Sequence, residues 1–246
     1  MPCFSAIDSV NKRIFSERER KWIETVWRLQ DELPQSKKEA FASNHGLPYL
    51  GGNVCRSLRL AEIARISSVT LLCGIFLFKL VRALRPVLCL ELGTCIGVSA
   101  AYQGAGLELN RRGKLLTVEK QRDLIVSAKK KFTRLKLNHR IATKLGNFNS
   151  TLADLAREKK AFDFVFIDGH HERDATISDF KSLQPILAKQ AVIIFDDIKW
   201  SKGMREAWNI IKQDSRIAID IDLGRMGICI IEGTRSGKKS FNAILK

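Results

Sequence analysis

The fold is decided by a glycine-rich turn that reads E-L-G-T-C-I-G-V-S over residues 91–99. It follows the apolar run Pro86–Leu92 and leads into a helical pattern over Ser99–Leu109. A strand that passes through such a turn into a helix is typical of an open α/β sheet, which binds its ligands at the carboxyl ends of the strands. The glycines are spaced G-x-x-x-G rather than G-x-G-x-x-G. The turn therefore predicts a ligand site and disfavours dinucleotide oxidoreduction.

The chain beyond this turn continues the same pattern, because short apolar runs alternate with helical segments. The predicted strands are Pro86–Leu92, Lys114–Val118, Arg140–Leu145, Phe162–Ile167 and Ala191–Phe195. The predicted crossover helices are Ser99–Leu109, Gln121–Leu135, Ser150–Arg157 and Ala175–Leu187. Two β-rich runs, Arg216–Asp222 and Met226–Glu232, predict a closing antiparallel hairpin. The fold class is thus α/β, a Rossmann-like doubly wound sheet, mostly parallel, with a C-terminal antiparallel hairpin.

The chain before residue 86 predicts a helical extension. Its expected helices are Glu17–Leu33, Leu58–Ile66 and Val69–Leu84, and a Gly-rich loop lies at Asn44–Asn53. We expect two parts: residues 1–85 as an N-terminal extension with a substrate or oligomer loop, and residues 86–246 as the ligand-binding domain. His45 and Tyr49 in the loop are candidates for the wall of an acceptor pocket. Trp22 and Trp27 lie on the apolar side of an amphipathic helix and predict packing or homo-oligomer contacts.

The composition indicates the cellular compartment of the protein. The six cysteines form no C-x-x-C pair, which disfavours a structural zinc site or a disulfide framework and indicates a reduced, cytoplasmic protein. The longest apolar run, Val69–Phe78, is about half the length that a membrane span requires, so no membrane partner is expected. Early charges with no apolar core before them also argue against a secretory signal.

The chain has 42 Lys plus Arg against 26 Asp plus Glu, a formal net charge of +16. Such a charge attracts nucleic-acid phosphates, and the cluster at Lys129, Lys130 and Lys131 is one place where it gathers. The alternative is a solvated helix face, since the apolar residues of the predicted helix 121–135 keep helical spacing and the basic residues fill the other side. Few aromatic residues interleave with the charges, which disfavours a base-stacking surface.

An acid at the end of the second predicted strand strengthens the ligand site. Glu119 can accept hydrogen bonds from the vicinal hydroxyls of a ribose, as acids at this position do in nucleoside-binding sheets. The alternative is a solvent-facing residue at a strand end. Together with the glycine turn, the ribose role is favoured.

Over residues 86–232 the chain resembles the class I S-adenosylmethionine-dependent methyltransferases, through the turn at 91–99, Glu119, the order of strands and the closing hairpin. The resemblance implies that S-adenosylmethionine is the cofactor, bound by residues 86–246, and that Glu119 binds its ribose. It also implies that the turn after the third strand contacts the adenine. The cofactor-binding residues implied by the resemblance are Glu91, Gly93, Thr94, Gly97, Ser99, Glu119, Asn147, Phe148 and Asp168.

Three carboxylates follow two neighbouring strands. Asp168 comes after Phe162–Ile167, and Asp196 and Asp197 come after Ala191–Phe195, so all three gather beside the proposed cofactor site. Their mutual repulsion requires a positive partner, and oxygen ligands suit a hard divalent cation such as Mg²⁺. The alternative is that Asp196 or Asp197 caps the next helix.

The acidic segment is similar to the metal-dependent small-molecule O-methyltransferases, of the catechol type and the macrolide-sugar type. The resemblance implies that Asp168, Asp196 and Asp197 hold the metal and that Asp168 is catalytic. His171 lies where the catechol-type enzymes carry a catalytic Lys, so it is a candidate base, and it is equally a candidate cap or packing residue. Neighbouring His170 is a weaker candidate.

The sequence thus predicts an enzyme that transfers a methyl group from S-adenosylmethionine to a hydroxyl of a small molecule, such as a sugar, a phenol or another natural product, with help from a divalent cation. An RNA methyltransferase that uses the basic surface is the alternative. A cofactor-binding scaffold without activity is a third hypothesis, which the three converging carboxylates disfavour.

Overall fold

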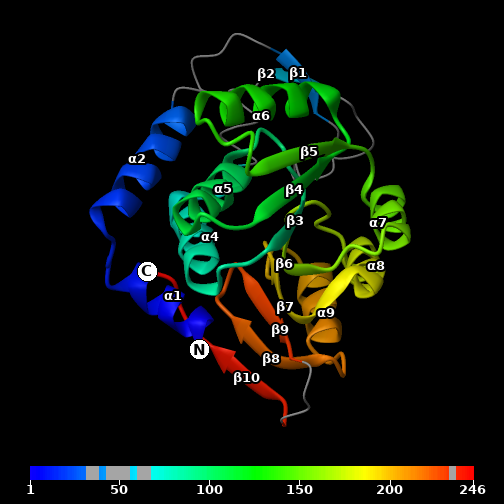
Figure 1. Ribbon diagram of the computed structural model, residues 1–246. Helices are drawn as coiled ribbons and strands as arrows, with labels where there is room; N and C mark the ends of the chain where they lie inside the picture. Colours follow the sequence, from blue (N-terminus) through cyan, green and yellow to red (C-terminus); the bar gives the residue numbers. More distant parts are fainter. Residues whose placement is uncertain (32–38, 43–55, 60–67, 233–236) are drawn as a thin grey trace.

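A computed structural model describes residues 1–31, 39–42, 56–59, 68–232 and 237–246. Its centre is a sheet of eight strands in the order β10-β8-β9-β7-β6-β3-β4-β5 (Figure 1). The strands are β3 (Leu88–Leu92), β4 (Lys114–Glu119), β5 (Ile141–Leu145), β6 (Phe162–Ile167), β7 (Leu187–Phe195), β8 (Ile217–Asp222), β9 (Gly227–Ile231) and β10 (Lys239–Asn242). The predicted α/β fold class is confirmed.

The sheet reverses its winding at β3, which pairs in parallel with β4 on one side and β6 on the other. β5 and β7 continue the parallel sheet outward, and β9 is antiparallel to both β7 and β8. The carboxyl ends of β3, β4, β6 and β7 therefore meet at one edge beside the switch point, which is where open α/β sheets bind ligands. This edge contains the predicted functional residues.

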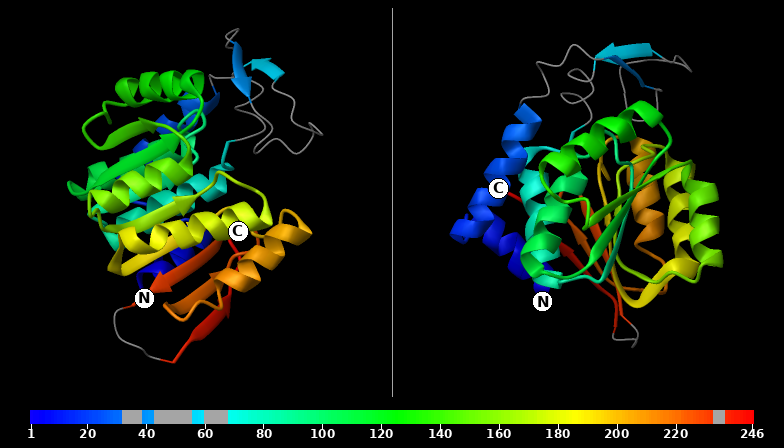
Figure 2. Two further views of the ribbon diagram at one scale, coloured as in Figure 1. Left: turned by 90° about the vertical axis from the view of Figure 1, so that its right-hand side faces the viewer. Right: turned by 45° about the horizontal axis from the view of Figure 1, so that its top comes forward.

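Two layers of helices enclose the sheet (Figure 2). The central strands are buried on both faces, and their side chains belong to two separate hydrophobic clusters. One layer consists of α1 (Pro2–Asn11), α4 (Leu71–Leu84), α5 (Val98–Asn110) and α6 (Arg122–Arg134), with α2 (Glu17–Asp31) outside it. The other layer consists of α7 (Phe148–Arg157), α8 (Arg173–Leu183) and α9 (Lys202–Ile211).

The N-terminal helices share the core of the sheet. α4 begins at its cap Thr70 and buries Phe76, Leu77 and Phe78 completely, as a helix that is apolar on all sides should. In α2, the buried carboxylate of Glu19 binds α4 through Lys79 at 3.2 Å and also through an arginine. The predicted division of the chain at residue 85 stays a prediction, since these helices pack as part of one body.

The two ends of the chain are tied together. Asn11 of α1 donates to the carbonyl of Ile244 at 2.8 Å, and its side-chain oxygen accepts the N–H of Lys246 at 2.8 Å. The sequence did not predict α1, β10 or the antiparallel pair β1 (Glu39–Ala42) and β2 (Arg56–Arg59). These elements are short, which weakens any periodic signal.

Several N-terminal predictions have a different outcome. The helix predicted over Leu58–Ile66 is wrong at its start, because residues 58 and 59 belong to β2, and its remainder lies outside the described residues. The loop Asn44–Asn53, with His45 and Tyr49, also lies outside them. Trp22 packs against the core, whereas Trp27 is 38% exposed. None of the helices in the described parts of the chain is long and apolar enough to cross a membrane.

Candidate functional site

The turn after β3 brings two glycines to the carboxyl edge of the sheet. Gly93 has φ +107° and Gly97 has φ +80°, both in the left-handed region that favours glycine. The N–H groups of Gly93 and Thr94 both donate to the carbonyl of Val118 on β4, each at 3.1 Å. Gly97 is then the N-cap of α5. A ligand can approach the backbone closely here, at the amino end of a helix.

Three residues predicted to contact the cofactor lie beneath this turn. Glu91 has no exposed surface, and its carboxylate accepts hydrogen bonds from Gln103 at 2.7 Å and from Thr117. Thr94 and Ser99 are also buried, and the Thr94 hydroxyl lies 2.6 Å from that of Thr117. Burial raises the pKa of Glu91 to about 7. In this arrangement the three residues hold the turn against β4 and α5.

Glu119 ends β4 next to the turn. Its Oε2 accepts the N–H of Cys95 at 2.9 Å, and its Oε1 accepts the N–H of Gln121 at 3.0 Å. Burial raises the pKa of the Glu119 carboxyl, although the backbone N–H groups act in the opposite direction. Each carboxylate oxygen can accept more than one hydrogen bond. Glu119 can therefore hold the turn and still accept the hydroxyls of a ribose.

The turn after β5 lies against the end of β6. Asn147 caps α7, since its side chain accepts the N–H of Ser150 at 2.8 Å. Phe148 packs over Gly169, where an added Cβ would come within 2.1 Å of the Phe148 ring. The Phe148 ring also meets that of His170 edge to face, with 4.9 Å between centroids. Phe148 is thus brought to the site, and Asn147 is engaged in the helix cap.

A buried lysine lies behind the glycine turn. Lys131 of α6 is 7% exposed, and its Nζ donates to the carbonyl of Ile96 at 2.9 Å. Burial lowers the pKa of Lys131 to about 8. The prediction that the basic residues of this helix all face solvent is therefore wrong at Lys131. Its spacing of three from Ala128 and seven from Leu124 places it on the apolar face, a signal that the sequence does contain.

The segments that carry the predicted acids Asp168 and Asp196 lie next to the glycine turn. The N–H of Asp168 donates to the carbonyl of Leu92 at 2.9 Å, and that of Asp196 donates to the carbonyl of Ile167 at 3.0 Å. A Cβ on Gly93 would lie 2.1 Å from the carbonyl oxygen of Asp168. Glycine therefore lets the end of β6 lie directly against the turn after β3. The glycine turn and the acids form one continuous site.

Arg225, which was not among the predicted site residues, binds two of the three acids, Asp196 and Asp197. It lies in the turn between β8 and β9, and its guanidinium donates two hydrogen bonds to Asp196, Nε to Oδ1 at 3.1 Å and Nη2 to Oδ2 at 3.0 Å. Its Nε also lies 3.1 Å from Oδ1 of Asp197. The Asp196 side chain is only 1% exposed. A charge-assisted, bidentate pair of this kind is the strongest form of Arg–carboxylate contact.

The sheet register explains this contact. β9 is antiparallel to β7, and Phe195 lies opposite Gly227. The turn that precedes β9 therefore lies at the carboxyl end of β7, beside residues 196 and 197. The predicted hairpin and the predicted strand before Asp196 together contained this signal, but only the pairing of β7 with β9 makes it visible.

Asp168 and Asp197 lie in an environment that disfavours their charge. Burial, followed by the carboxylates of Asp196 and Asp197, raises the pKa of Asp168 well above its ordinary value. Burial, followed by Asp196, raises the pKa of Asp197 to about 6. Asp197 has φ +53°, a conformation that costs free energy and often marks functional sites. The helix-cap alternative is wrong, because Ser201 caps α9.

His171 stands between two of the acids. Its Nε2 lies 3.9 Å from Oδ1 of Asp168, and its Nδ1 lies 3.7 Å from Oδ2 of Asp197. Among the described residues Nδ1 has no hydrogen-bond partner, although it is buried. Burial lowers the pKa of His171. His170 differs, since its Nδ1 is hydrogen-bonded to Asp179 at 2.8 Å. His171 is therefore the better candidate base.

The acidic group does not fit a divalent cation as it is arranged. In the parts of the chain that the structure describes, no group of three or more His, Cys, Asp or Glu side chains is placed to hold a metal ion. Both oxygens of Asp196 already bind the guanidinium of Arg225. The predicted magnesium site at Asp168, Asp196 and Asp197 is not confirmed. The glycine turn and Glu119, by contrast, fit a nucleoside cofactor.

Comparison with known proteins identifies the segment that carries both halves of the site. The family described as "Methyltransferase domain" matches residues 90–198, which run from β3 to just beyond β7. This segment is similar to that family. The match supports the predicted enzyme class, the S-adenosylmethionine-dependent methyltransferases. No curated protein matches the chain.

Solved structures of methyltransferases share the fold. The O-methyltransferase from Bacillus cereus in complex with SAH is 20% identical, with a TM-score of 0.61 over 89% of this chain and 92% of that one. TomG from Streptomyces achromogenes, an O-methyltransferase of tomaymycin synthesis bound to SAM, is 21% identical, with a TM-score of 0.59 over 68% and 83%. The SAH-bound methyltransferase PaMTH1 from Podospora anserina is 18% identical, with a TM-score of 0.59 over 70% and 82%.

Proposed function

We propose that this protein transfers a methyl group from S-adenosylmethionine to a hydroxyl oxygen of a small molecule, such as a sugar, a phenol or another natural product. The observation that carries the proposal is the contact between the two halves of the site, where Gly93 lies against the carbonyl of Asp168. A donor over the glycine turn would lie beside polar groups that can orient an alcohol. Two of the similar structures are themselves named O-methyltransferases, which supports oxygen as the acceptor atom.

The donor side has a residue for each part of the cofactor. When bound, S-adenosylmethionine supplies an electrophilic methyl group. Glu119 would accept the ribose hydroxyls, and the turn at Gly93 and Gly97 would receive the methionine part. Phe148, packed at the end of β6, would contact the adenine. Lys131 and Glu91 hold the turn from behind, so the donor site is formed before the cofactor binds.

We assign the proton transfer on the acceptor side to His171. Its low pKa favours the neutral imidazole, which can take the proton of an acceptor hydroxyl. Asp197, at 3.7 Å and with a pKa of about 6, would stabilise the imidazolium that forms. Asp168 lies beside the donor turn, so it can orient both partners. Metal assistance stays a prediction, and these steps do not require it.

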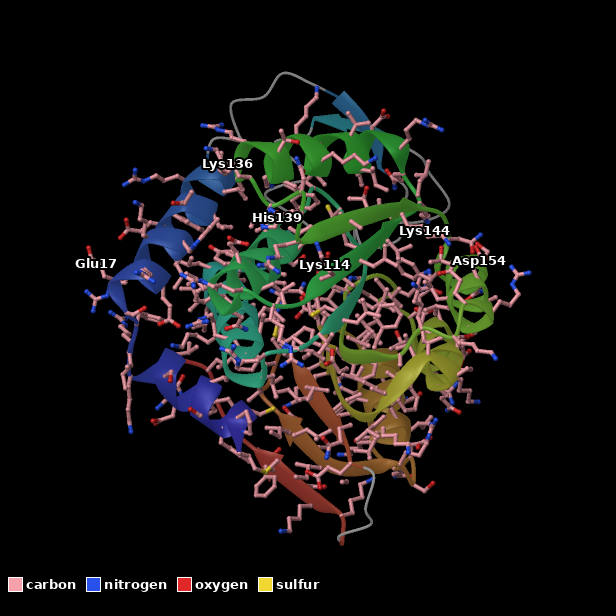
Figure 3. All side chains as sticks on the ribbon, viewed as in Figure 1. Glu17, Lys114, Lys136, His139, Lys144 and Asp154 are labelled. Atoms are coloured by element: carbon pink, nitrogen blue, oxygen red, sulfur yellow. The ribbon has the colours of Figure 1, made fainter. Side chains whose placement is uncertain are left out.

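The ribose of RNA is the alternative acceptor. The net charge of +16 favours it. Part of that charge is already paired within the protein: Lys144 contacts Asp154 at 3.1 Å, and both lie on the side of β5 and α7 in Figure 3. The small-molecule proposal also includes a reducing, cytoplasmic setting, which is consistent with the free thiols of the five described cysteines.

Two measurements test the proposal. Calorimetry with S-adenosylhomocysteine should show binding, and labelled methyl groups from S-adenosylmethionine should enter members of a panel of catechols and sugars but not RNA. The variant His171→Gln should lower turnover by about 10²–10⁴-fold, the usual contribution of a positioned base. His170→Gln, whose histidine binds Asp179 instead, is the matched control and should retain turnover. Absence of binding heat would overturn the proposal. Incorporation of label into RNA would instead support RNA as the acceptor.

A further inference from the structure

We propose that Arg225 is the resident cation of the acceptor pocket and that methyl transfer in this protein proceeds without a divalent metal. The guanidinium would take the place that a metal ion holds in the metal-dependent enzymes that the sequence resembles. The inference rests on the proposed function in one respect, namely that the pocket of Asp168, Asp196 and Asp197 receives the acceptor. Its geometric basis is independent of that function.

The first support is the strength of the contact. Asp196 is almost fully buried, and a carboxylate in that position requires a partner. Arg225 supplies it through two hydrogen bonds of 3.1 and 3.0 Å and reaches Asp197 with the same Nε at 3.1 Å. A cation that used these three acids would need oxygen atoms that the guanidinium already occupies. Metal binding would therefore have to displace Arg225 and leave its charge unpaired.

The second support is the way in which the fold presents Arg225. The backbone carbonyl of Arg225 accepts the N–H of Ile198, directly after the acidic pair, at 2.9 Å. Gly224 has φ +87°, and its N–H donates to the Asp222 side chain at 2.7 Å. Asp222 in turn binds Lys199 at 2.9 Å. These contacts fasten the β8–β9 turn to the segment after β7, so the guanidinium is built into the site.

The inference has a chemical consequence. A bound metal would activate an alcohol by direct contact with its oxygen. A guanidinium whose donors face carboxylates cannot do this; it fixes the position of Asp196 and Asp197 instead. Activation of the hydroxyl is then left to the imidazole of His171, which lies 3.7 Å from Asp197. Arg225 is on this view a positioning residue, and His171 is the group that contacts the acceptor.

Binding of Mn²⁺, followed by electron paramagnetic resonance on the full chain, tests the inference without an acceptor. Wild-type protein should leave added Mn²⁺ free. Arg225→Met leaves the carboxylates of Asp196 and Asp197 without their cation and should raise the affinity for Mn²⁺ by about tenfold or more. Arg225→Lys keeps the positive charge and should stay near wild type. Arg216→Met is the matched control, since Arg216 binds Asp214 in a similar bidentate pair at the other end of β8. Stoichiometric Mn²⁺ binding by the wild type, lost in Asp196→Asn, would overturn the inference.

Two further measurements control for variants that fold poorly and distinguish failure of this inference from failure of the proposed function. Calorimetry with S-adenosylhomocysteine reports whether each variant keeps its donor site, and the wild-type Mn²⁺ titration needs no variant. Methyl transfer by the wild type should be equal in excess EDTA and in excess Mg²⁺. Activity that EDTA abolishes and Mg²⁺ restores would overturn the role of Arg225 and leave the proposed function standing. If no acceptor is methylated, the proposed function fails while the Mn²⁺ titration still decides this inference.

Discussion

The donor side and the acceptor side of the site stabilise their buried carboxylates in different ways. On the donor side, Glu119 accepts backbone N–H groups from Cys95 and Gln121. On the acceptor side, Asp196 binds the side chain of Arg225, 29 residues further along the chain. Backbone donors come with the turn itself, whereas the guanidinium depends on one residue in a distant hairpin.

This difference teaches how such a site can change. A donor subsite built from backbone groups persists as long as the turn after β3 keeps its conformation. An acceptor subsite whose charge depends on one side chain can be altered by a single substitution, with the donor subsite intact. We therefore expect substitutions on the two sides to separate binding of the cofactor from turnover.

Gly93 joins the two sides, and its substitution should have the largest effect. In Gly93→Ala the new Cβ would meet the Asp168 carbonyl at 2.1 Å, in a backbone conformation of φ +107° that alanine adopts only under strain. We expect loss of both cofactor binding and turnover, and a decrease of about 2 kcal/mol or more in the free energy of unfolding. Calorimetry and urea denaturation measure these effects. Gly237→Ala, with nothing within 4 Å of its Cβ, is the control.

Asp168→Ala tests the acceptor side, because the contact of residue 168 with the donor turn is made by its backbone. It removes the carboxylate near His171 and keeps the backbone contact with the glycine turn. Turnover should fall by about a hundredfold or more, because the base and the acceptor lose their orientation. The affinity for S-adenosylhomocysteine should change little. A parallel loss of affinity and turnover would show that the two sides are not separable.

Glu119→Ala is the corresponding test of the donor side. Loss of the ribose contacts, together worth about 1.5–3 kcal/mol, should weaken binding of S-adenosylhomocysteine by about 10–100-fold. Turnover at saturating cofactor should be reduced far less. Initial rates over a range of cofactor concentrations distinguish the two effects. Reduced turnover at saturation with unchanged affinity would contradict the ribose role.

The same contrast explains what the sequence could predict. The strands, their parallel order and the donor turn follow from local patterns: apolar runs, glycines at 93 and 97, and an acid that ends β4. The three acids were also visible, because each directly follows a strand. Of the predicted site residues, Asn147 proved to be a helix cap, and Glu91 is enclosed by Gln103 and Thr117.

Two residues of the site were not predicted from the sequence. Arg225 reaches Asp196 only because β9 inserts between β7 and β8, a pairing that no local pattern specifies. Lys131 carries a charge on the apolar face of α6, and composition favours the interpretation that a lysine is solvated. Both are charged side chains whose partners lie far away in the sequence.

Lys131 is an exception to the contrast between the two sides, because its side chain donates a hydrogen bond to the carbonyl of Ile96 in the donor turn. Burial lowers its pKa to about 8 from the ordinary 10.5, so the unfolded chain binds the proton more tightly than the folded protein. Stability then rises with pH as the folded lysine loses its proton, between about pH 8 and 10.5. Relative to Lys131→Met, the wild type should gain about 2 kcal/mol of unfolding free energy between about pH 7 and pH 10. Groups common to both proteins cancel in this difference, and exposed Lys129→Met should show no such trend. A flat difference would mean that the lysine is not enclosed behind the turn, and the donor side would then depend on backbone contacts alone.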